Sequence, residues 1–102
     1  MSSAVLVFHQ KLLLDSGGIV EMKLWQVPSS VRGSRHTFKY SLFFGKNGRR
    51  LIAYDNEAGK GDHRHYEDIE LPYVFSTKEQ LVNDFLADVQ NWIDREEGDD
   101  DD

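Results

Sequence analysis

The stretch RHTFKYSLFF at residues 35–44 alternates polar and apolar side chains, and this alternation constrains the fold more than any other feature. Successive side chains of a β-strand point to opposite faces. One face of the predicted strand is therefore aromatic and aliphatic, and the other carries Arg35 and Lys39. Asn47-Gly48 follows and supplies the positive φ angles of a two-residue hairpin turn. The sequence therefore predicts an antiparallel β-hairpin at the centre of the chain.

The predicted turn also fixes how the two strands pair. A two-residue turn at Asn47-Gly48 sets each residue of the first strand opposite one residue of the second. We expect the partners to be Phe44 with Leu51, Leu42 with Ala53, Tyr40 with Asp55 and, on the opposite side, Ser41 with Tyr54.

The segments before this hairpin predict a second one. Residues 4–14 are apolar and rich in β-formers, and Asp15-Ser16-Gly17-Gly18 is a turn signal. Residues 19–27 then alternate in the manner of a strand. Residues 28–34 predict a loop before the central strand.

The last third of the chain predicts a short strand and a helix. Residues 65–69 suit a strand, and residues 71–75 suit an extended lead into the helix. Ser76 and Glu79 have the spacing of a capping box, with Ser76 as the N-cap. Apolar residues then recur at spacings of three and four, which predicts an amphipathic helix that ends near Arg95.

Together these elements predict an α+β domain, a four- to five-stranded antiparallel β-meander with one C-terminal α-helix packed on one face. The chain has 102 residues, which is enough for one domain. We assign residues 1–95 to that domain and residues 96–102 to an acidic disordered tail. A single helix covers one face of such a sheet. The other face is then solvated, meets a ligand or forms a homodimer interface.

The charge is unevenly distributed along the chain. The net charge is −6, but residues 96–102 hold six acidic residues, and without them the remaining acids and bases balance. Residues 31–54 hold six lysines and arginines and no acid. This basic segment could bind nucleic acid, with Arg35 and Lys39 on the sheet face, although solvated sheet faces are also commonly polar. The acidic tail is either a solvated run or a segment that shields the basic one.

The chain has no cysteine, which excludes disulfides, thiolate metal sites and cysteine nucleophiles. No apolar run approaches the length of a membrane span. We therefore expect a cytoplasmic protein.

The segment YDNEAGKGDHRHY, residues 54–66, is unusually dense in ionisable side chains. A metal site at His63 and His65, with Asp55 or Asp62 and with His36 as a third nitrogen ligand, is one interpretation. Zinc usually takes three or four protein ligands, so the His-x-His pair is weak evidence and we predict no metal and no cofactor. A turn closed by Asp55 and Asn56, with a surface ion pair between Asp62 and Arg64, is the purely structural alternative.

Acid–base cleavage of RNA by its own 2′-hydroxyl is the more economical functional interpretation. Such a reaction needs a base, an acid and cations that stabilise the phosphorane charge. Imidazoles exchange protons near neutral pH. The predicted catalytic residues are His63 and His65 as base and acid, and Arg64 and Lys60 as the cationic clamp. The predicted substrate-binding residues are Tyr54, Asp55, Asn56, Asp62, Tyr66, Arg35 and Lys39. We expect Gly59 and Gly61 to let backbone amides approach an anion.

The runs GSRHTFKYSLFFGKNGRRLIAYDNEAGKGDHRH and LVNDFLADV, with the Pro72, Tyr73 and Phe75 motif between them, resemble the TumE family of bacterial and archaeal toxins. The resemblance spans residues 22–92. It implies a cytoplasmic toxin of a toxin–antitoxin pair, whose antitoxin partner commonly has a helix-turn-helix DNA-binding domain. It also implies that the matching residues between Tyr54 and His65 form the site, without assigning a catalytic role to any of them.

Two functions therefore remain open at this point. The first is an RNA-targeting toxin, a metal-independent endoribonuclease that an antitoxin neutralises. The second is a non-enzymatic module that binds nucleic acid or protein through the GKGDHRH loop and the basic sheet face.

Overall fold

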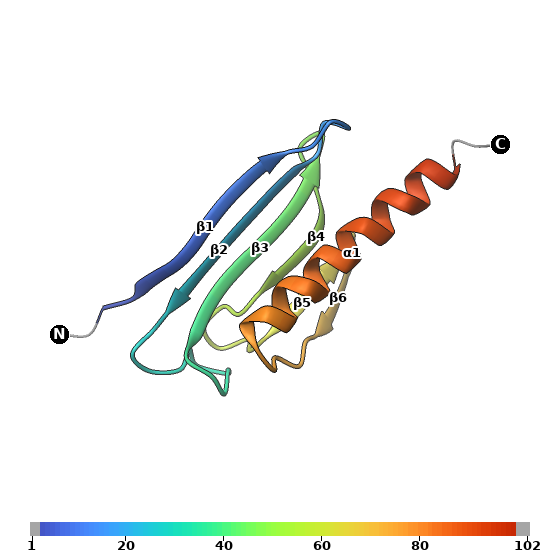
Figure 1. The fold of residues 1–102 in the computed structure, drawn as a ribbon. Coiled ribbons are helices and arrows are strands. Elements are labelled where there is room, and N and C mark those ends of the chain that lie inside the picture. Colours follow the sequence, from blue (N-terminus) through green and yellow to red (C-terminus); the bar gives the residue numbers. More distant parts are fainter. Residues whose placement is uncertain (1–2, 100–102) are drawn as a thin grey trace.

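A computed structural model, which describes residues 3–99, shows one antiparallel sheet and one helix (Figure 1). The six strands lie in the sheet in chain order, each antiparallel to the next. The elements are β1 (Val5–Leu13), β2 (Ile19–Gln26), β3 (Phe38–Lys46), β4 (Arg49–Asp55), β5 (His63–Tyr66), β6 (Ile69–Pro72) and α1 (Lys78–Asp99). The predicted α+β meander with a C-terminal helix is confirmed.

The sheet has one more strand than the upper expectation. We expected one strand at residues 65–69, but the chain turns within that range and forms the hairpin of β5 and β6. Glu67 adopts a φ of 54°, a left-handed conformation that few non-glycine residues adopt. The expected central strand is also shorter at its start, because residues 35–37 belong to the loop before β3.

The predicted register of β3 and β4 is wrong beyond the first two pairs. Asn47 and Gly48 have φ of 55° and 75°, as the predicted turn requires, and Gly45 lies opposite Arg50. A β-bulge then inserts one extra residue into β4, so that Phe44 pairs with Ile52 instead of Leu51. Every later pair moves by one residue, and a one-residue shift reverses the face on which a side chain lies.

The bulge therefore decides which residues of β4 share each face. Leu42 pairs with Tyr54, and Ser41 pairs with Asp55. We call the face that carries Met22, Leu42, Tyr54 and Arg64 the helix face, because α1 packs on it. We call the face that carries Lys23, Ser41, Asp55 and His63 the open face. Each set is a row of paired residues across β2, β3, β4 and β5.

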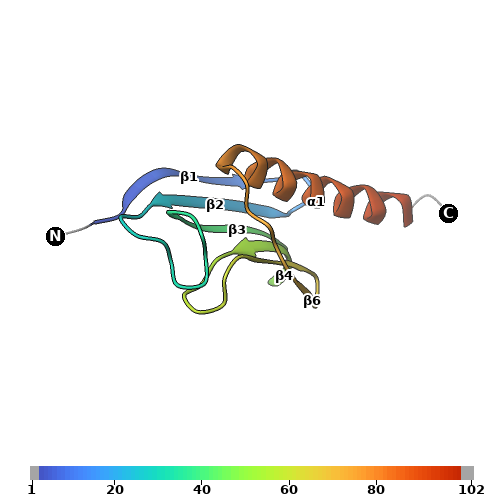
Figure 2. The ribbon, with the colours of Figure 1, turned by 90° about the horizontal axis from the view of Figure 1, so that it is seen from below.

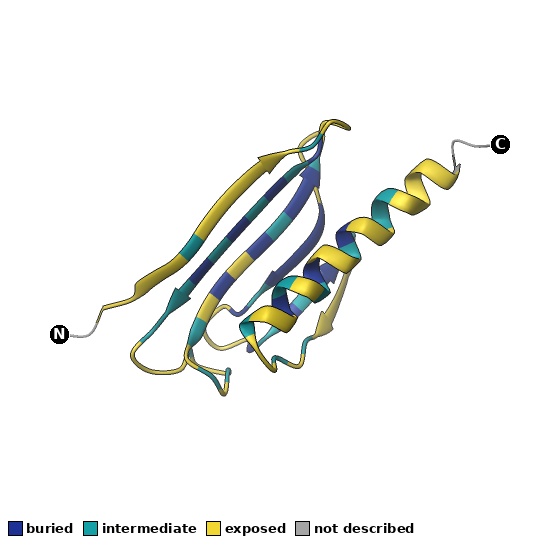
Figure 3. Ribbon diagram, viewed as in Figure 1, coloured by how far each residue is buried: buried dark blue, intermediate teal, exposed yellow. Residues whose placement is uncertain are grey.

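Helix α1 lies along the helix face and leaves the open face without a covering helix (Figures 1 and 2). Phe85 and Leu81 are fully buried against the sheet. The Phe85 ring meets the Tyr54 ring edge to face, with centroids 5.9 Å apart. Burial is concentrated in β2, β3, β4 and one side of α1, whereas β1 at the sheet edge is largely exposed (Figure 3).

The helix begins and ends later than the sequence predicts. Its first residue is Lys78, and the Thr77 hydroxyl accepts a hydrogen bond of 3.0 Å from the Gln80 amide. Thr77 is therefore the N-cap in place of Ser76, since the two adjacent hydroxyl residues are alternative caps. The helix continues to Asp99, so residues 96–99 of the predicted acidic tail are helical. Residues 100–102 of that tail lie outside the described part of the chain.

Candidate functional site

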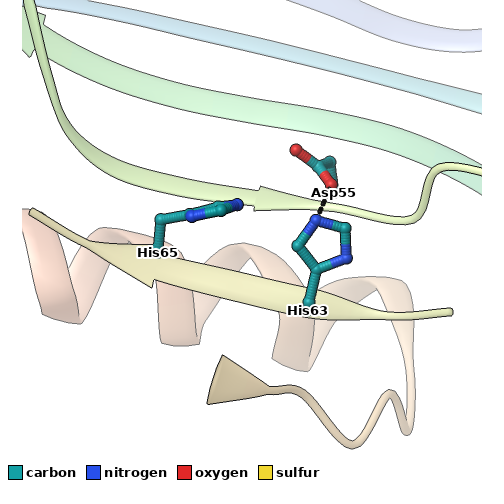
Figure 4. A group of neighbouring side chains, drawn as sticks. All are labelled: Asp55, His63 and His65. Atoms are coloured by element: carbon teal, nitrogen blue, oxygen red, sulfur yellow. Dashed lines mark ion pairs between the residues drawn. The ribbon is translucent and has the colours of Figure 1, made fainter. Parts of the chain in front are cut away.

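Two imidazoles and a carboxylate gather on the open face where β4 meets β5 (Figure 4). His63 pairs with Asp55, and His65 follows two positions later, so the pleat of the sheet directs all three side chains to one face. The two imidazole rings lie nearly perpendicular, with centroids 5.2 Å apart. His63 and His65 are 5% and 8% exposed, so both rings are largely shielded from water.

His63 is held from both ring nitrogens. Nδ1 lies 3.0 Å from the carbonyl oxygen of Gly61. A carbonyl oxygen can only accept, so the proton of this hydrogen bond belongs to Nδ1. Nε2 lies 2.5 Å from Oδ1 of Asp55 and 4.0 Å from Oε1 of Glu70. The ring nitrogen of His63 that faces Asp55 and the cluster is therefore Nε2.

Asp55 supplies an unsatisfied oxygen to the cluster. Its Oδ1 is buried and, among residues 3–99, has no partner that meets hydrogen-bond geometry, although Nε2 of His63 lies close to it. Buried polar atoms are normally hydrogen-bonded, so such an atom calls for an explanation. One donor atom from each of Asp55, His63 and His65 lies within 4.8 Å of the other two. These are the residues that could hold a metal ion.

His65 is the more readily deprotonated imidazole. Burial lowers its pKa from 6.5, and the positive charge of Arg50 lowers it further. The carboxylates of Glu70 and Asp55 oppose this effect only in part, since the net direction is downward. His65 is therefore neutral at neutral pH and can accept a proton.

Arg64 lies on the helix face, away from the two imidazoles. Its Nη1 lies 3.2 Å from Oδ2 of Asp88 on α1 and donates to the Tyr54 hydroxyl at 3.2 Å. The predicted role of Arg64 as a clamp beside His63 and His65 does not fit this structure, because alternate residues of β5 point to opposite faces. Arg64 instead connects the sheet to the helix.

The two tyrosines of the predicted site also lie on the helix face. Tyr54 is fully buried, and its hydroxyl donates to Asp88 at 2.6 Å. Burial and the bond to Asp88 raise the pKa of Tyr54 well above its usual range. Tyr66 is half-buried and accepts a hydrogen bond from Arg95 at 3.3 Å. The predicted role of Tyr54 in binding substrate does not fit this conformation, since its ring is not exposed.

Asp62 and Asn56 hold the loops together. Asp62 accepts three hydrogen bonds, from the Ser34 hydroxyl at 2.5 Å, from Nε2 of His36 at 2.6 Å and from the Tyr40 hydroxyl at 2.7 Å. Asn56 is fully buried and accepts from the Tyr40 amide at 3.0 Å. These contacts replace the surface ion pair between Asp62 and Arg64 that we considered from sequence.

His36 is not available as the third nitrogen ligand of a metal. Its Nδ1 accepts from the Phe38 amide at 3.1 Å, so Nε2 carries the proton that it donates to Asp62. Its ring stacks on Phe75 with centroids 3.8 Å apart. Of the metal ligands that we considered from sequence, Asp55 lies in the cluster with His63 and His65, whereas His36 and Asp62 lie in a structural network.

The glycines of the dense segment fit two loops closely against each other. Gly59 has a φ of 89°, and its amide donates to the Arg32 carbonyl at 2.7 Å. That amide cannot also bind an anion, contrary to our expectation. Gly61 has a φ of 76°, and a Cβ there would lie 2.9 Å from the carbonyl oxygen of Gly33. Only glycine combines this backbone conformation with this close approach.

The remaining predicted residues are exposed cations. Lys60 and Arg35 line a hollow of about 360 Å³ between the loops, together with His36 and Phe75. Lys60 also lines a second hollow beside His63. Lys39 is exposed on β3, where it pairs with Trp25 on the open face. Of the four predicted catalytic residues, the structure groups His63 and His65, places Lys60 beside them in a loop and separates Arg64.

Sequence analysis missed Arg50 as a charge that acts on His65. Arg50 pairs with Gly45, and its charge acts on His65. Sequence analysis also missed Ser41, which is exposed opposite Asp55. The alternation of residues 35–44 did assign Ser41 to the polar face, but the predicted register put Tyr54 rather than Asp55 beside it.

The fold and the site place the chain in a class of small α+β proteins with an ionisable cluster on one face of a meander sheet. A family model described as Toxin TumE matches residues 4–93. The chain therefore belongs to the TumE toxin family, and the match begins earlier than the residues 22–92 that carried the resemblance. No curated protein and no solved structure matches the chain. Within residues 3–99, no helix is both long and apolar enough to cross a membrane.

Proposed function

We propose that the protein is a cytoplasmic toxin that cleaves RNA without a metal ion and that a DNA-binding antitoxin neutralises it. The observation that carries the proposal is the pairing of two imidazoles with a carboxylate on the face of the sheet that the helix leaves free. RNA supplies its own nucleophile in the 2′-hydroxyl, so two proton-transferring groups and nearby cations suffice.

His65 acts as the base in this proposal. A base must be neutral before the reaction, and the lowered pKa of His65 favours the neutral imidazole. His65 takes the proton of the 2′-hydroxyl, whose oxygen attacks the adjacent phosphorus. A 2′,3′-cyclic phosphate forms as the bond from phosphorus to the 5′-oxygen breaks.

His63 acts as the acid. Nε2 of His63 carries the proton that is transferred, and the Asp55 carboxylate, 2.5 Å away, holds this nitrogen toward the cluster. His63 gives this proton to the departing 5′-oxygen. The surroundings of the two imidazoles thus support His65 as the base and His63 as the acid, the reverse of the order in which the sequence analysis named these roles.

Cations of the open face and its rim replace Arg64 as the phosphate-binding groups. Arg50 lies close enough to His65 to affect its pKa, and Lys60 lines the hollow beside His63. Lys39 and Lys23 lie on the neighbouring strands of the same face. Positive charge along this face would follow the RNA backbone.

A cleavage assay on a labelled RNA oligonucleotide in EDTA tests the proposal. We expect cleavage by the wild-type protein and a loss of about 100- to 10,000-fold for His65→Gln and for His63→Gln. A 2′-deoxy residue at the cleaved position should abolish the cut, since it removes the nucleophile. Arg64→Met is the matched control, because it changes the neighbouring side chain on the opposite face.

Two results would contradict the proposal. One is cleavage at the wild-type rate by both histidine variants. The other is growth arrest on induced expression while total RNA stays intact, which would indicate a toxin with another target. An adjacent gene for a short DNA-binding protein that restores growth when expressed together with the toxin would support the proposed antitoxin.

A non-enzymatic binding module is the second candidate. The exposed cations Arg35 and Lys60, which line one hollow between the loops, favour it. In that case RNA should bind without being cut, and its affinity should fall steeply with salt. Arg35→Ala together with Lys60→Ala should then weaken binding, whereas His65→Gln should not.

A further inference from the structure

The Asp55, His63 and His65 cluster has the donor set of a transition-metal site. It offers two imidazole nitrogens and one carboxylate oxygen, with the donor atoms within 4.8 Å of one another. In a tetrahedral zinc site with bonds of about 2.0–2.1 Å, neighbouring donor atoms lie about 3.3 Å apart. Small side-chain rotations would therefore bring the three donors to that spacing.

His63 is already oriented as metal-binding histidines are. Its Nδ1–H donates to the Gly61 carbonyl at 3.0 Å, which leaves Nε2 to point into the cluster. A hydrogen bond from the second ring nitrogen to a backbone carbonyl is a common way for proteins to fix the tautomer and the ring of a histidine ligand. The left-handed conformation of Gly61 against Gly33 holds that carbonyl in place.

Asp55 supplies a second, independent indication. Its Oδ1 is buried and lacks a hydrogen-bond partner among the described residues, yet it lies 2.5 Å from Nε2 of His63. A cation bound between the two atoms would satisfy the oxygen and use the nitrogen lone pair at once. A hydrogen bond alone does not account for this arrangement, because the contact lacks the required direction.

We propose that Asp55, His63 and His65 bind one Zn²⁺ ion, or a first-row ion of similar ligand preference, through three protein ligands and an open fourth position. Two imidazoles and one carboxylate suit zinc, whereas Mg²⁺ and Ca²⁺ prefer oxygen ligands alone. The open position lies toward the side of the sheet that no helix covers. A water molecule or a phosphate oxygen of RNA can occupy it.

Zinc binding at this cluster would inhibit the toxin. The ion occupies the nitrogen lone pairs, so the two imidazoles can no longer carry the protons that the reaction transfers. This consequence rests on the proposed function, whereas the binding itself does not. Zinc would then act as a second restraint on the toxin, independent of the antitoxin.

The test is a zinc titration of the full chain, without an affinity tag, in competition with a chromophoric chelator. We expect one ion per chain and no competition by Mg²⁺. His65→Gln and Asp55→Asn should each raise the Kd at least about 10-fold, because even the loss of an outer hydrogen bond to a ligand costs about 10–100-fold. His9→Gln is the control, since His9 is an exposed histidine on β1 whose imidazole contacts the Glu21 carboxylate.

A second measurement covers the case in which a variant folds poorly. In the wild-type protein labelled with ¹⁵N, zinc should shift the Nε2 resonance of His63 and a ring-nitrogen resonance of His65, and leave those of His9 and His36 in place. Absence of binding, or equal affinity in the wild type and in both cluster variants, would overturn the inference. Shifts confined to His9 or His36 would overturn it as well.

The RNA assay separates this inference from the proposed function. Cleavage in EDTA, together with its suppression by one equivalent of zinc in a metal-free buffer without chelator, supports both. If zinc neither binds nor changes the cleavage, the proposed nuclease activity is supported and the proposed metal site is contradicted. If zinc binds but the protein does not cleave RNA in EDTA, the proposed metal site is supported and the proposed metal-independent nuclease activity is contradicted.

Discussion

The helix face and the open face of the sheet use similar residue types for different purposes. On the helix face, Tyr54, Arg64 and Asp88 satisfy one another and join the sheet to α1. On the open face, Asp55, His63 and His65 crowd together, and Oδ1 of Asp55 remains without a hydrogen-bond partner among the described residues. The difference indicates that charged residues next to one another in sequence have different surroundings according to the face they occupy: satisfied partners on one face, a crowded and incompletely satisfied cluster on the other.

The largest expected contrast between the faces is in packing. Phe85→Ala removes a fully buried ring from beneath the sheet, and we expect it to lower the free energy of unfolding by about 3–5 kcal/mol. Ser41→Ala, on the exposed side of β3, should change it by less than about 0.5 kcal/mol. Urea denaturation followed by circular dichroism measures both. Equal losses would mean that the open face is packed against something in solution.

The next contrast concerns the buried hydroxyl of the helix face. Tyr54→Phe leaves Asp88 and Arg64 without their shared partner and should cost about 1–3 kcal/mol of stability. RNA cleavage and zinc affinity should stay near wild type under conditions where the variant is folded. Tyr66→Phe is the matched control, since the Tyr66 hydroxyl accepts only a long bond from Arg95. A loss of cleavage in folded Tyr54→Phe would show that the two faces are coupled.

The smallest contrast is the pH dependence of stability on the open face. The pKa of His65 is lower in the fold than its ordinary 6.5, so the unfolded chain binds this proton more tightly. In the metal-free protein, His65 therefore lowers the free energy of unfolding as the pH falls below about 6.5. Well above that pH it has no such effect. When the pH is lowered from 7.5 to 5.5, the free energy of unfolding of the wild type should fall relative to that of His65→Gln. A constant difference across that range would contradict the assigned environment of His65.

Local patterns of the sequence were enough to predict most of the fold. The alternation of residues 35–44, the Asn47-Gly48 turn and the apolar spacing of residues 81–93 specify two strands and the helix. Each of these signals is confined to a few neighbouring residues. The choice between Ser76 and Thr77 as the N-cap was not decided locally, because both hydroxyls suit that position.

The sequence was enough to predict which segment forms the candidate site, but not how the side chains of that segment are placed. Sequence analysis selected residues 54–66 for their density of ionisable groups, and His63 and His65 do lie together. Which of Arg64 and Asp55 lies on the helix face and which on the open face depends on the bulge in β4, which leaves no mark on the alternation of either strand. The partners of Asp62 lie 22–28 residues away in sequence, so a local reading could not connect Asp62 to Ser34, His36 and Tyr40.

The extra residue of β4 decides on which face of the sheet each later side chain of that strand lies, as counted from the Asn47-Gly48 turn. Deleting Leu51 would remove the bulge and still leave Phe44 opposite Ile52 and Leu42 opposite Tyr54, so that Tyr54 stays under α1 and Asp55 on the open face. Regular pairing at the present length would instead set Phe44 opposite Leu51, and every later residue of β4 would then change face. The extra residue of this short strand therefore decides which of its side chains join His63 and His65 on the open face.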